Sequence, residues 1–239
     1  MAYENSETIT ELIKACREGN LEEVKRLVGK SSHLYNEALS CAVIQGDLKT
    51  VKHLIEEGAD IHAQDDAALK WAVIYGHADI VKYLIEKGAN VHVQDDFALR
   101  SYVNDIEMVK YLTSKGADVN ALDGSALKEA VQRGNLEVAK VLVEAGADIK
   151  DGKALTYAVL FGFLEIVKYL VECGADVRKV SLEYTYREDI MLILLEKLSV
   201  EELLPLLVSN DKKVRKVAKF VLKGGKHGPD RPNNGMQNR

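Results

Sequence analysis

The chain has 239 residues, of which 47 % are hydrophobic and 29 % charged, and its formal net charge is −5. This apolar content can form a sizeable core, and it excludes wholesale disorder. Three separated cysteines argue against a disulfide framework or a zinc site. The longest apolar run, residues 190–195, is too short to cross a bilayer, and the polar N-terminus does not resemble a secretory signal. We expect a cytoplasmic protein without a membrane span.

Charge is distributed unevenly along the chain. Residues 212–239 contain nine Lys or Arg and one acid, Asp230, so this end carries +8 and residues 1–211 carry −13. An acidic body disfavours nucleic acid as a partner, because attraction to phosphates supplies most of such affinity. It favours a protein partner that has a basic patch.

Two sequence markers recur with a period of 28 or 30 residues. An Ala-Leu pair ends at Leu39, Leu69, Leu99, Leu127 and Leu155, and a Gly-Ala-Asp/Asn triplet begins at Gly58, Gly88, Gly116, Gly146 and Gly174. Apolar residues between the markers have helical spacing, and a glycine interrupts each unit, so each unit predicts two short helices. Such helix pairs cannot bury their faces alone, and successive copies must therefore stack.

The repeated string A-L-x-x-A-V-x-x-G-x-x-x-I-V-K-Y-L-x-E-x-G-A-D-V, as in residues 154–177, resembles the ankyrin repeat. The resemblance implies an all-α solenoid of about seven stacked helix-turn-helix units over residues 5–198. Degenerate units at 11–28 and 181–198 would serve as caps. The period is shorter than the usual 33 residues and Thr-Pro is absent, which predicts short turns in place of β-hairpin fingers. Compressed repeats of this style are similar to those abundant in giant DNA viruses and in some intracellular bacteria, and a viral origin would place the protein in the host cytoplasm.

The chain after residue 198 follows a different pattern. Residues 199–223 are similar to a single HEAT-type helix pair that would cover the end of the array, with Asp211 as the N-cap of its second helix. Residues 224–239 have the composition of a disordered tail. Residues 186–222 also loosely resemble an F-box, which gives an alternative function, a ubiquitin-ligase substrate adaptor.

Signals for catalysis are absent from the sequence. It has no nucleotide-binding, nucleophile-elbow or metalloprotease motif, so we expect no enzymatic activity, no cofactor and no metal. The pairs Asp65-Asp66 and Asp95-Asp96 recur with the repeat, and we expect the second acid of each pair to cap a helix, where the helix dipole favours negative charge. Cys41 has no evident basic neighbour that would make it a nucleophile.

The resemblance to ankyrin repeats implies a binding surface on the concave side, formed by first helices and turns. Residues at these positions that the repeat core does not need are Ile44, Gln45, Trp71, Ile74, Tyr75, Glu129, Arg133, Tyr157, Leu160 and Phe161. Exposed aromatic side chains on a rigid surface are typical anchors of protein interfaces. The alternative is that these side chains pack against neighbouring repeats. We therefore predict a monomeric, non-catalytic scaffold for protein–protein interaction.

Two further segments carry functional hypotheses. Residues 112–120 resemble the acceptor sequence of asparaginyl hydroxylases, with Asn120 as the acceptor; the alternative is an asparagine that only hydrogen-bonds the turn. Residues 212–223 carry six positive charges, which predicts a solvated basic face or, alternatively, contact with an acidic partner or an anionic membrane surface.

Overall fold

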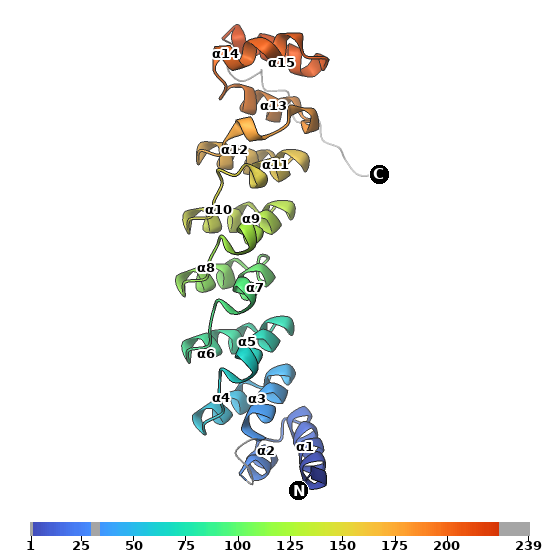
Figure 1. Ribbon diagram of the computed structural model, residues 1–239, viewed down its shortest axis with the longest axis vertical. Coiled ribbons are helices and arrows are strands. Elements are labelled where there is room, and N and C mark those ends of the chain that lie inside the picture. Colours follow the sequence, from blue (N-terminus) through green and yellow to red (C-terminus); the bar gives the residue numbers. More distant parts are fainter. Residues whose placement is uncertain (1, 30–33, 225–239) are drawn as a thin grey trace, which may run out of the picture. The chain divides into compact units, whose positions relative to one another are not determined.

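A computed structural model describes residues 2–29 and 34–224 (Figure 1). These residues form helices and connecting turns and contain no β-strand, which confirms the predicted all-α fold with short turns. The predicted tail lies almost wholly outside the described residues. The chain divides into two compact units, residues 1–126 with 144–146 and residues 127–143 with 147–239, and each is described by itself.

The first unit contains paired helices in two layers. Its helices are α1 (Ala2–Arg17), α2 (Leu21–Val28), α3 (Leu34–Gln45), α4 (Leu48–Glu56), α5 (Ala63–Ile74), α6 (Ala78–Glu86), α7 (Val93–Ser101), α8 (Ile106–Ser114) and the start of α9 (Ala121–Gln132). The first helices α1, α3, α5 and α7 pack against one another in this order, and α4 packs against α6. The degenerate first unit of the sequence is therefore a complete helix pair, α1 and α2.

The second unit continues the pairs and ends in a different arrangement. It contains α10 (Leu136–Glu144), α11 (Lys153–Leu160), α12 (Leu164–Glu172), η1 (Val177–Lys179), η2 (Leu182–Tyr184), α13 (Glu188–Leu195), α14 (Val200–Leu203), η3 (Leu204–Val208) and α15 (Lys212–Leu222), where η marks a 3₁₀ helix. The Asp211 carboxylate accepts hydrogen bonds from the N–H groups of Lys213 (2.7 Å) and Val214 (3.4 Å), which confirms the predicted N-cap of α15. Met191, Leu203 and Ala218 belong to the core that joins α13, α14 and α15.

The core repeats with the sequence. Leu69, Ala72 and Val73 of α5 are buried, and so are Leu155, Ala158 and Val159 at the same positions of α11. Burial of each large aliphatic side chain stabilises the fold by about 1.5–3 kcal/mol, and the small alanines allow close approach of the helices. The recurring Leu, Ala and Val positions thus form the core, and the residues between them are not needed for packing.

The first residues of α5, α7 and α9 differ from the sequence prediction. Gln64, Asp65 and Asp66 all have positive φ between 53° and 61°, and residues 94–96 and 122–124 share this left-handed conformation. The prediction that Asp66 and Asp96 cap a helix is wrong. The buried Asp66 carboxylate instead receives hydrogen bonds from Nδ1 of His62 (3.1 Å) and from the Asn90 N–H of the next repeat (3.0 Å).

Second helices of successive repeats are joined by tyrosines. In the first unit the Tyr111 hydroxyl donates to the Lys82 carbonyl at 3.0 Å, and the Lys82 ammonium lies 5.6 Å from the Tyr111 ring centroid. In the second unit the Tyr169 hydroxyl donates to the Lys140 carbonyl at 3.5 Å. The recurring Lys-Tyr-Leu of the sequence therefore provides contacts between repeats as well as a helical face.

Candidate protein-binding surface

One group of exposed aromatic and aliphatic side chains lies at the C-terminal end of α5. Trp71, Ile74 and Tyr75, the first aromatic cluster, are 37 %, 54 % and 51 % exposed. The Trp71 and Tyr75 ring centroids are 6.3 Å apart, and Tyr75 stacks on His77 at 6.3 Å. Nε2 of His77 lies 3.2 Å from the Ile44 carbonyl oxygen of the preceding repeat, so this hydrogen bond holds the stack in place.

A second group occupies the same place in α11. Tyr157, Leu160 and Phe161, the second aromatic cluster, include two exposed side chains, Leu160 at 42 % and Phe161 at 50 %. Phe161 stacks between Tyr157 (6.4 Å) and Phe163 (6.0 Å). Phe163 packs on Gly134 of the preceding repeat, where an added Cβ would meet its ring at 3.0 Å.

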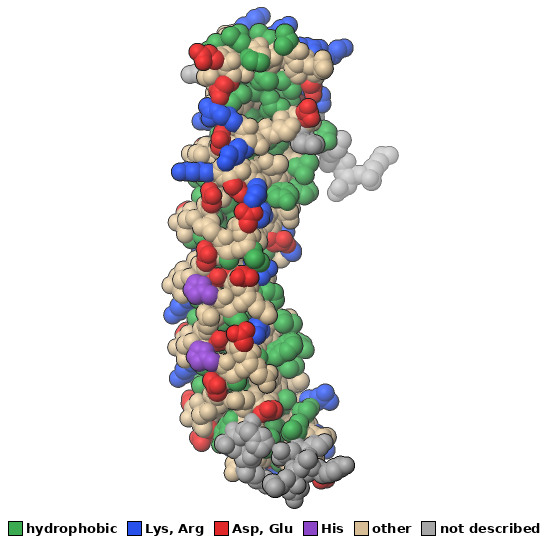
Figure 2. Space-filling model, in the orientation of Figure 1, with side chains coloured by type: hydrophobic (Ala, Val, Ile, Leu, Met, Phe, Trp, Pro, Cys, Tyr) green, Lys and Arg blue, Asp and Glu red, His purple; other side chains and the backbone are tan. Residues whose placement is uncertain are grey.

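The two clusters use equivalent repeat positions. Tyr157, Phe161 and Phe163 each follow their counterparts Trp71, Tyr75 and His77 by 86 residues. Figure 2 shows hydrophobic side chains gathered along the edge where α5 and α7 lie in the first unit, and again beside α11 in the second. Other residues fill the repeat core, so the rings of the two clusters remain accessible at the surface. The contacts with His77 and Phe163 hold these rings in place.

The structure distributes the remaining predicted contact residues between the two units. In the first unit Ile44 is half-buried and Gln45 is exposed. In the second unit Arg133 is exposed and forms an ion pair with the half-buried Glu129 at 2.6 Å. An exposed pair of this kind contributes little to stability, and its role in binding stays a prediction.

The pairing of two cysteines, Cys16 and Cys41, was not predicted from the sequence. Cys16 of α1 is buried, and its sulfur lies 4.0 Å from the Ala38 carbonyl oxygen of α3, one turn before the half-buried Cys41. A hydrogen bond from Cys16 and the nearby charge of Arg17 lower the pKa of Cys41 to about 7, whereas the bond to Cys41 and burial raise the pKa of Cys16. The basic neighbour that the sequence did not reveal is thus Arg17, which follows Cys16 directly. Only the packing of α1 on α3 brings these groups together.

Asn120 lies in the turn that precedes α9 and is exposed. Its side-chain amide donates to the Gly146 carbonyl at 3.1 Å, and its backbone N–H donates to Asp118 at 2.8 Å. These hydrogen bonds match the turn role weighed above, and hydroxylation stays a prediction.

The F-box-like segment presents several apolar side chains. Val200, Leu204 and Val208 are 62 %, 52 % and 83 % exposed.

Within the described residues no group of three or more His, Cys, Asp or Glu could hold a metal ion. Across the same ranges, 2–29 and 34–224, the helices are all too short or too polar to span a bilayer.

Comparison with known proteins identifies the family. A family model described as ankyrin repeats (3 copies) matches residues 5–95 and 97–181, more than half of the chain, and the chain belongs to this family. The chain is similar to the crystal structure of the ankyrin repeat domain of Bcl-3, described as a unique member of the IkappaB protein family. That similarity has a TM-score of 0.60 and 24 % identity over 87 % of this chain and 97 % of the other. No curated protein sequence matches the chain significantly. Ankyrin repeats are generally modules for protein–protein interaction, and the fold is typically non-catalytic.

Proposed function

We propose that this protein is a monomeric, cytoplasmic, non-catalytic scaffold that binds a partner protein through its two aromatic clusters. The observation that carries the proposal is the exposure of Trp71, Tyr75 and Phe161 on helices whose buried faces are complete without them. Aromatic side chains offer large contact areas at low entropic cost, and truncation of such anchors typically weakens binding by about 2 kcal/mol or more each.

The mechanism of recognition is pre-organisation. His77 and Phe163 are each fixed against the preceding repeat, and each stacks on an exposed ring of its cluster. A partner therefore meets rings that are already ordered, and little side-chain entropy is lost on binding. The acidic body, −13 over residues 1–211, favours a partner with a basic patch, whose encounter is accelerated by electrostatic attraction.

The test is affinity purification with the wild-type chain beside the triple variant Trp71→Ala/Tyr75→Ala/Phe161→Ala. We expect the variant to lose partners while its helical circular dichroism and thermal midpoint stay close to wild type, because the three side chains are exposed. A matched control, Lys49→Ala/Glu144→Ala, removes exposed polar side chains from the second helices α4 and α10, which hold none of the predicted contact residues, and should retain the partners. Retention of every partner by the triple variant contradicts the proposal.

The adaptor alternative is tested in the same experiment. Leu204→Glu/Val208→Glu places charges on exposed positions of η3, so the fold is retained while an F-box-like contact is lost. Loss of ubiquitin-ligase subunits by this variant alone identifies an adaptor. Capture of the same partners by this variant and by wild type leaves the segment as a cap.

A further inference from the structure

Two cavities adjoin in the second unit, at the point where the repeat pattern breaks. After the last Gly-Ala-Asp turn, Gly174 to Asp176, the chain forms η1 and η2 instead of a long first helix. The basic cavity, about 460 Å³, is lined by Lys150, Val171, Gly174, Ala175, Asp176, Val177, Arg178, Lys179 and Lys197. The leucine cavity, about 310 Å³, is lined by Val177, Arg178, Val180, Leu182, Leu194, Leu198, Glu202 and Leu206. The two cavities share Val177 and Arg178.

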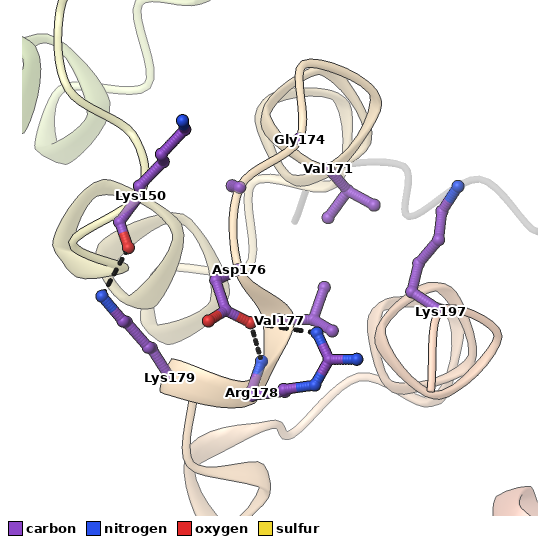
Figure 3. Close-up of a pocket in the computed structure, with 9 residues that line it drawn as sticks. Lys150, Val171, Gly174, Asp176, Val177, Arg178, Lys179 and Lys197 are labelled. Carbon is purple, nitrogen blue, oxygen red and sulfur yellow. Dashed lines mark hydrogen bonds and ion pairs between the residues drawn. The ribbon is translucent and has the colours of Figure 1, made fainter. Parts of the chain in front are cut away.

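The basic cavity concentrates positive charge in an acidic stretch. Residues 147–200 contain seven Lys or Arg and nine Asp or Glu, yet the cavity takes four of the seven cations and only one of the acids, Asp176. Figure 3 shows Lys150 and Lys197 on opposite sides of the cavity, with Val171 and Val177 between them. Neither Lys150 nor Lys197 forms an ion pair within the described part of the chain. Both charges are available to a ligand.

A third lysine is fixed in place without losing its charge. Lys179 Nζ donates to the Lys150 carbonyl oxygen at 2.6 Å (Figure 3), and a backbone carbonyl leaves the ammonium charge uncompensated. Its stem packs on Gly152, where an added Cβ would stand 2.5 Å from the Lys179 Cβ. Gly152 has φ +79°, so glycine is favoured at this position for its backbone as well as for its size. The Lys179 ammonium is thus fixed at the edge of the cavity, and its positive charge remains uncompensated.

Arg178 forms the wall between the cavities. Its Nε donates to Glu202 at 2.5 Å, and its guanidinium also contacts Asp176 at 3.5 Å. Arg178 lines both cavities and separates them. Because both carboxylates compensate its charge, Arg178 does not supply the positive charge that is available to a ligand. Even with Glu202 counted, the cations around the site outnumber the acids by two.

The leucine cavity supplies the apolar half of the site. Val180 and Leu194 are buried, whereas Leu182, Leu198 and Leu206 are half-buried and reach the cavity from η2, from the turn after α13 and from η3. Its walls are aliphatic apart from Arg178 and Glu202, whose charged groups pair with each other. A cavity of about 310 Å³ has room for a branched aliphatic side chain, whose burial removes apolar surface from water and so strengthens binding.

We propose that the two cavities together bind an acidic segment of a partner protein, with its carboxylates at Lys150, Lys179 and Lys197 and one aliphatic side chain in the leucine cavity. Charge complementarity selects this occupant. The chain's own residues 225–239 contain three Lys or Arg and one acid, so the same charges repel them. The site shares no residue with the aromatic clusters and takes a ligand of opposite charge to the partner expected there.

The test uses a fluorescein-labelled peptide, Gly-Glu-Asp-Glu-Gly-Leu-Gly, and the same residues in reverse order, with binding to the full chain followed by fluorescence anisotropy. At least one order should bind saturably at micromolar to sub-millimolar concentration, and affinity should fall roughly fivefold between 50 and 300 mM salt. Replacement of the three acids by their amides should abolish binding. Replacement of the leucine by serine should weaken it roughly tenfold, as expected when burial of one aliphatic side chain is lost.

Matched protein variants locate the site. Lys150→Glu/Lys197→Glu should weaken the leucine peptide at least tenfold, because it reverses both unpaired charges. Lys212→Glu/Lys219→Glu changes the net charge equally on the exposed face of α15 and should stay within twofold of wild type. Circular dichroism should be unchanged in both, since none of the four side chains is buried.

Three outcomes overturn the proposal. Equal weakening by both double variants means non-specific attraction to the positive charge of the protein. An unchanged affinity of the serine peptide means that the leucine cavity is not used. Displacement of the peptide by inorganic phosphate at equal concentration means a site for small anions. None of these outcomes bears on the aromatic clusters, because the variants leave them intact.

Discussion

The buried Asp96 carboxylate accepts a hydrogen bond from the backbone N–H of Asp118, 22 residues later, at 2.9 Å. The same oxygen receives a hydrogen bond from Nδ1 of His92 at 3.1 Å. One carboxylate therefore closes the left-handed turn at the start of its own repeat and fixes the start of the next. Asp66 does the same one repeat earlier, with Asn90 as the donor.

We predict that Asp96→Asn destabilises the protein by about 1–2 kcal/mol, since an amide replaces a carboxylate that accepts both bonds and is buried. Asparagine tolerates positive φ, so the backbone cost of the substitution is small. Urea unfolding followed by circular dichroism measures the change. The control is Asp95→Asn, the exposed neighbour in the same left-handed turn, which should shift stability by less than about 0.5 kcal/mol. Equal effects of the two variants would refute the role of the buried carboxylate.

A second prediction concerns the contact between Gly46 and His77. An added Cβ at Gly46 would meet the His77 ring at 2.6 Å, and Gly46 also has φ +76°. Gly76 has nearly the same φ, +75°, but open space around it. We expect Gly76→Ala to cost about 1 kcal/mol from backbone strain alone. Gly46→Ala should cost at least twice as much and should disturb the Tyr75–His77 stack, which a tyrosine fluorescence or chemical-shift change would report.

The sequence alone predicted the repeat period, the helix pairs and the buried Leu, Ala and Val positions, because the spacing of apolar residues sets which side chains share a helix face. It did not predict the left-handed turns. Three successive residues with positive φ are unfavourable locally, and here hydrogen bonds to the buried Asp66 and Asp96 accompany them. The recurrence of His at one position and Asp four residues later was the available signal.

The Cys16–Cys41 contact and the two cavities could not be read from the sequence. The cysteines are 25 residues apart and meet only through the packing of α1 on α3. The cavities depend on the short 3₁₀ helices after Asp176, where the sequence suggested only a degenerate repeat.

Cys41 should react with iodoacetamide at neutral pH, in contrast to the buried Cys16. Because the pKa of Cys41 is lowered to about 7, its labelling rate should rise between pH 6 and pH 8 and then level off. Peptide mass spectrometry distinguishes the three cysteines. Arg17→Gln should raise this pKa and slow labelling of Cys41 at pH 7 roughly twofold, while Lys49→Gln on the exposed face of α4 should not. An unaltered pH profile in Arg17→Gln would contradict the assigned cause.

The Arg178–Glu202 pair makes the stability of the fold depend on pH. Hydrogen bonds from Arg178 and from the Ser199 N–H lower the pKa of Glu202 from 4.5 to about 2. Because the pKa of Glu202 is lower in the folded state, its carboxylate stabilises the fold fully at pH values above about 4.5. This stabilisation is lost as the pH falls from about 4.5 towards 2. Glu202→Gln should therefore lower the thermal midpoint at pH 7, and its difference from wild type should vanish near pH 2. Glu201→Gln, next to it, should show no such convergence.

Hydroxylation of Asn120 is tested by incubation of the full chain with an asparaginyl hydroxylase, its oxoacid co-substrate and oxygen. The resemblance predicts the addition of one oxygen atom to the peptide that contains Asn120. Asn120→Ala should abolish the product, and Asn90→Ala, at the preceding repeat, should retain it. A product on both variants would place the modification elsewhere.

The 86-residue correspondence between the two aromatic clusters has an evolutionary consequence. A recombination event that inserts or deletes a whole repeat between α5 and α11 would preserve each set of rings and change only the number of repeats that separates them. The number of copies between the clusters could then vary while each cluster keeps its own contacts with the preceding repeat. A lineage could match new partners by gene duplication alone, before any contact residue mutates.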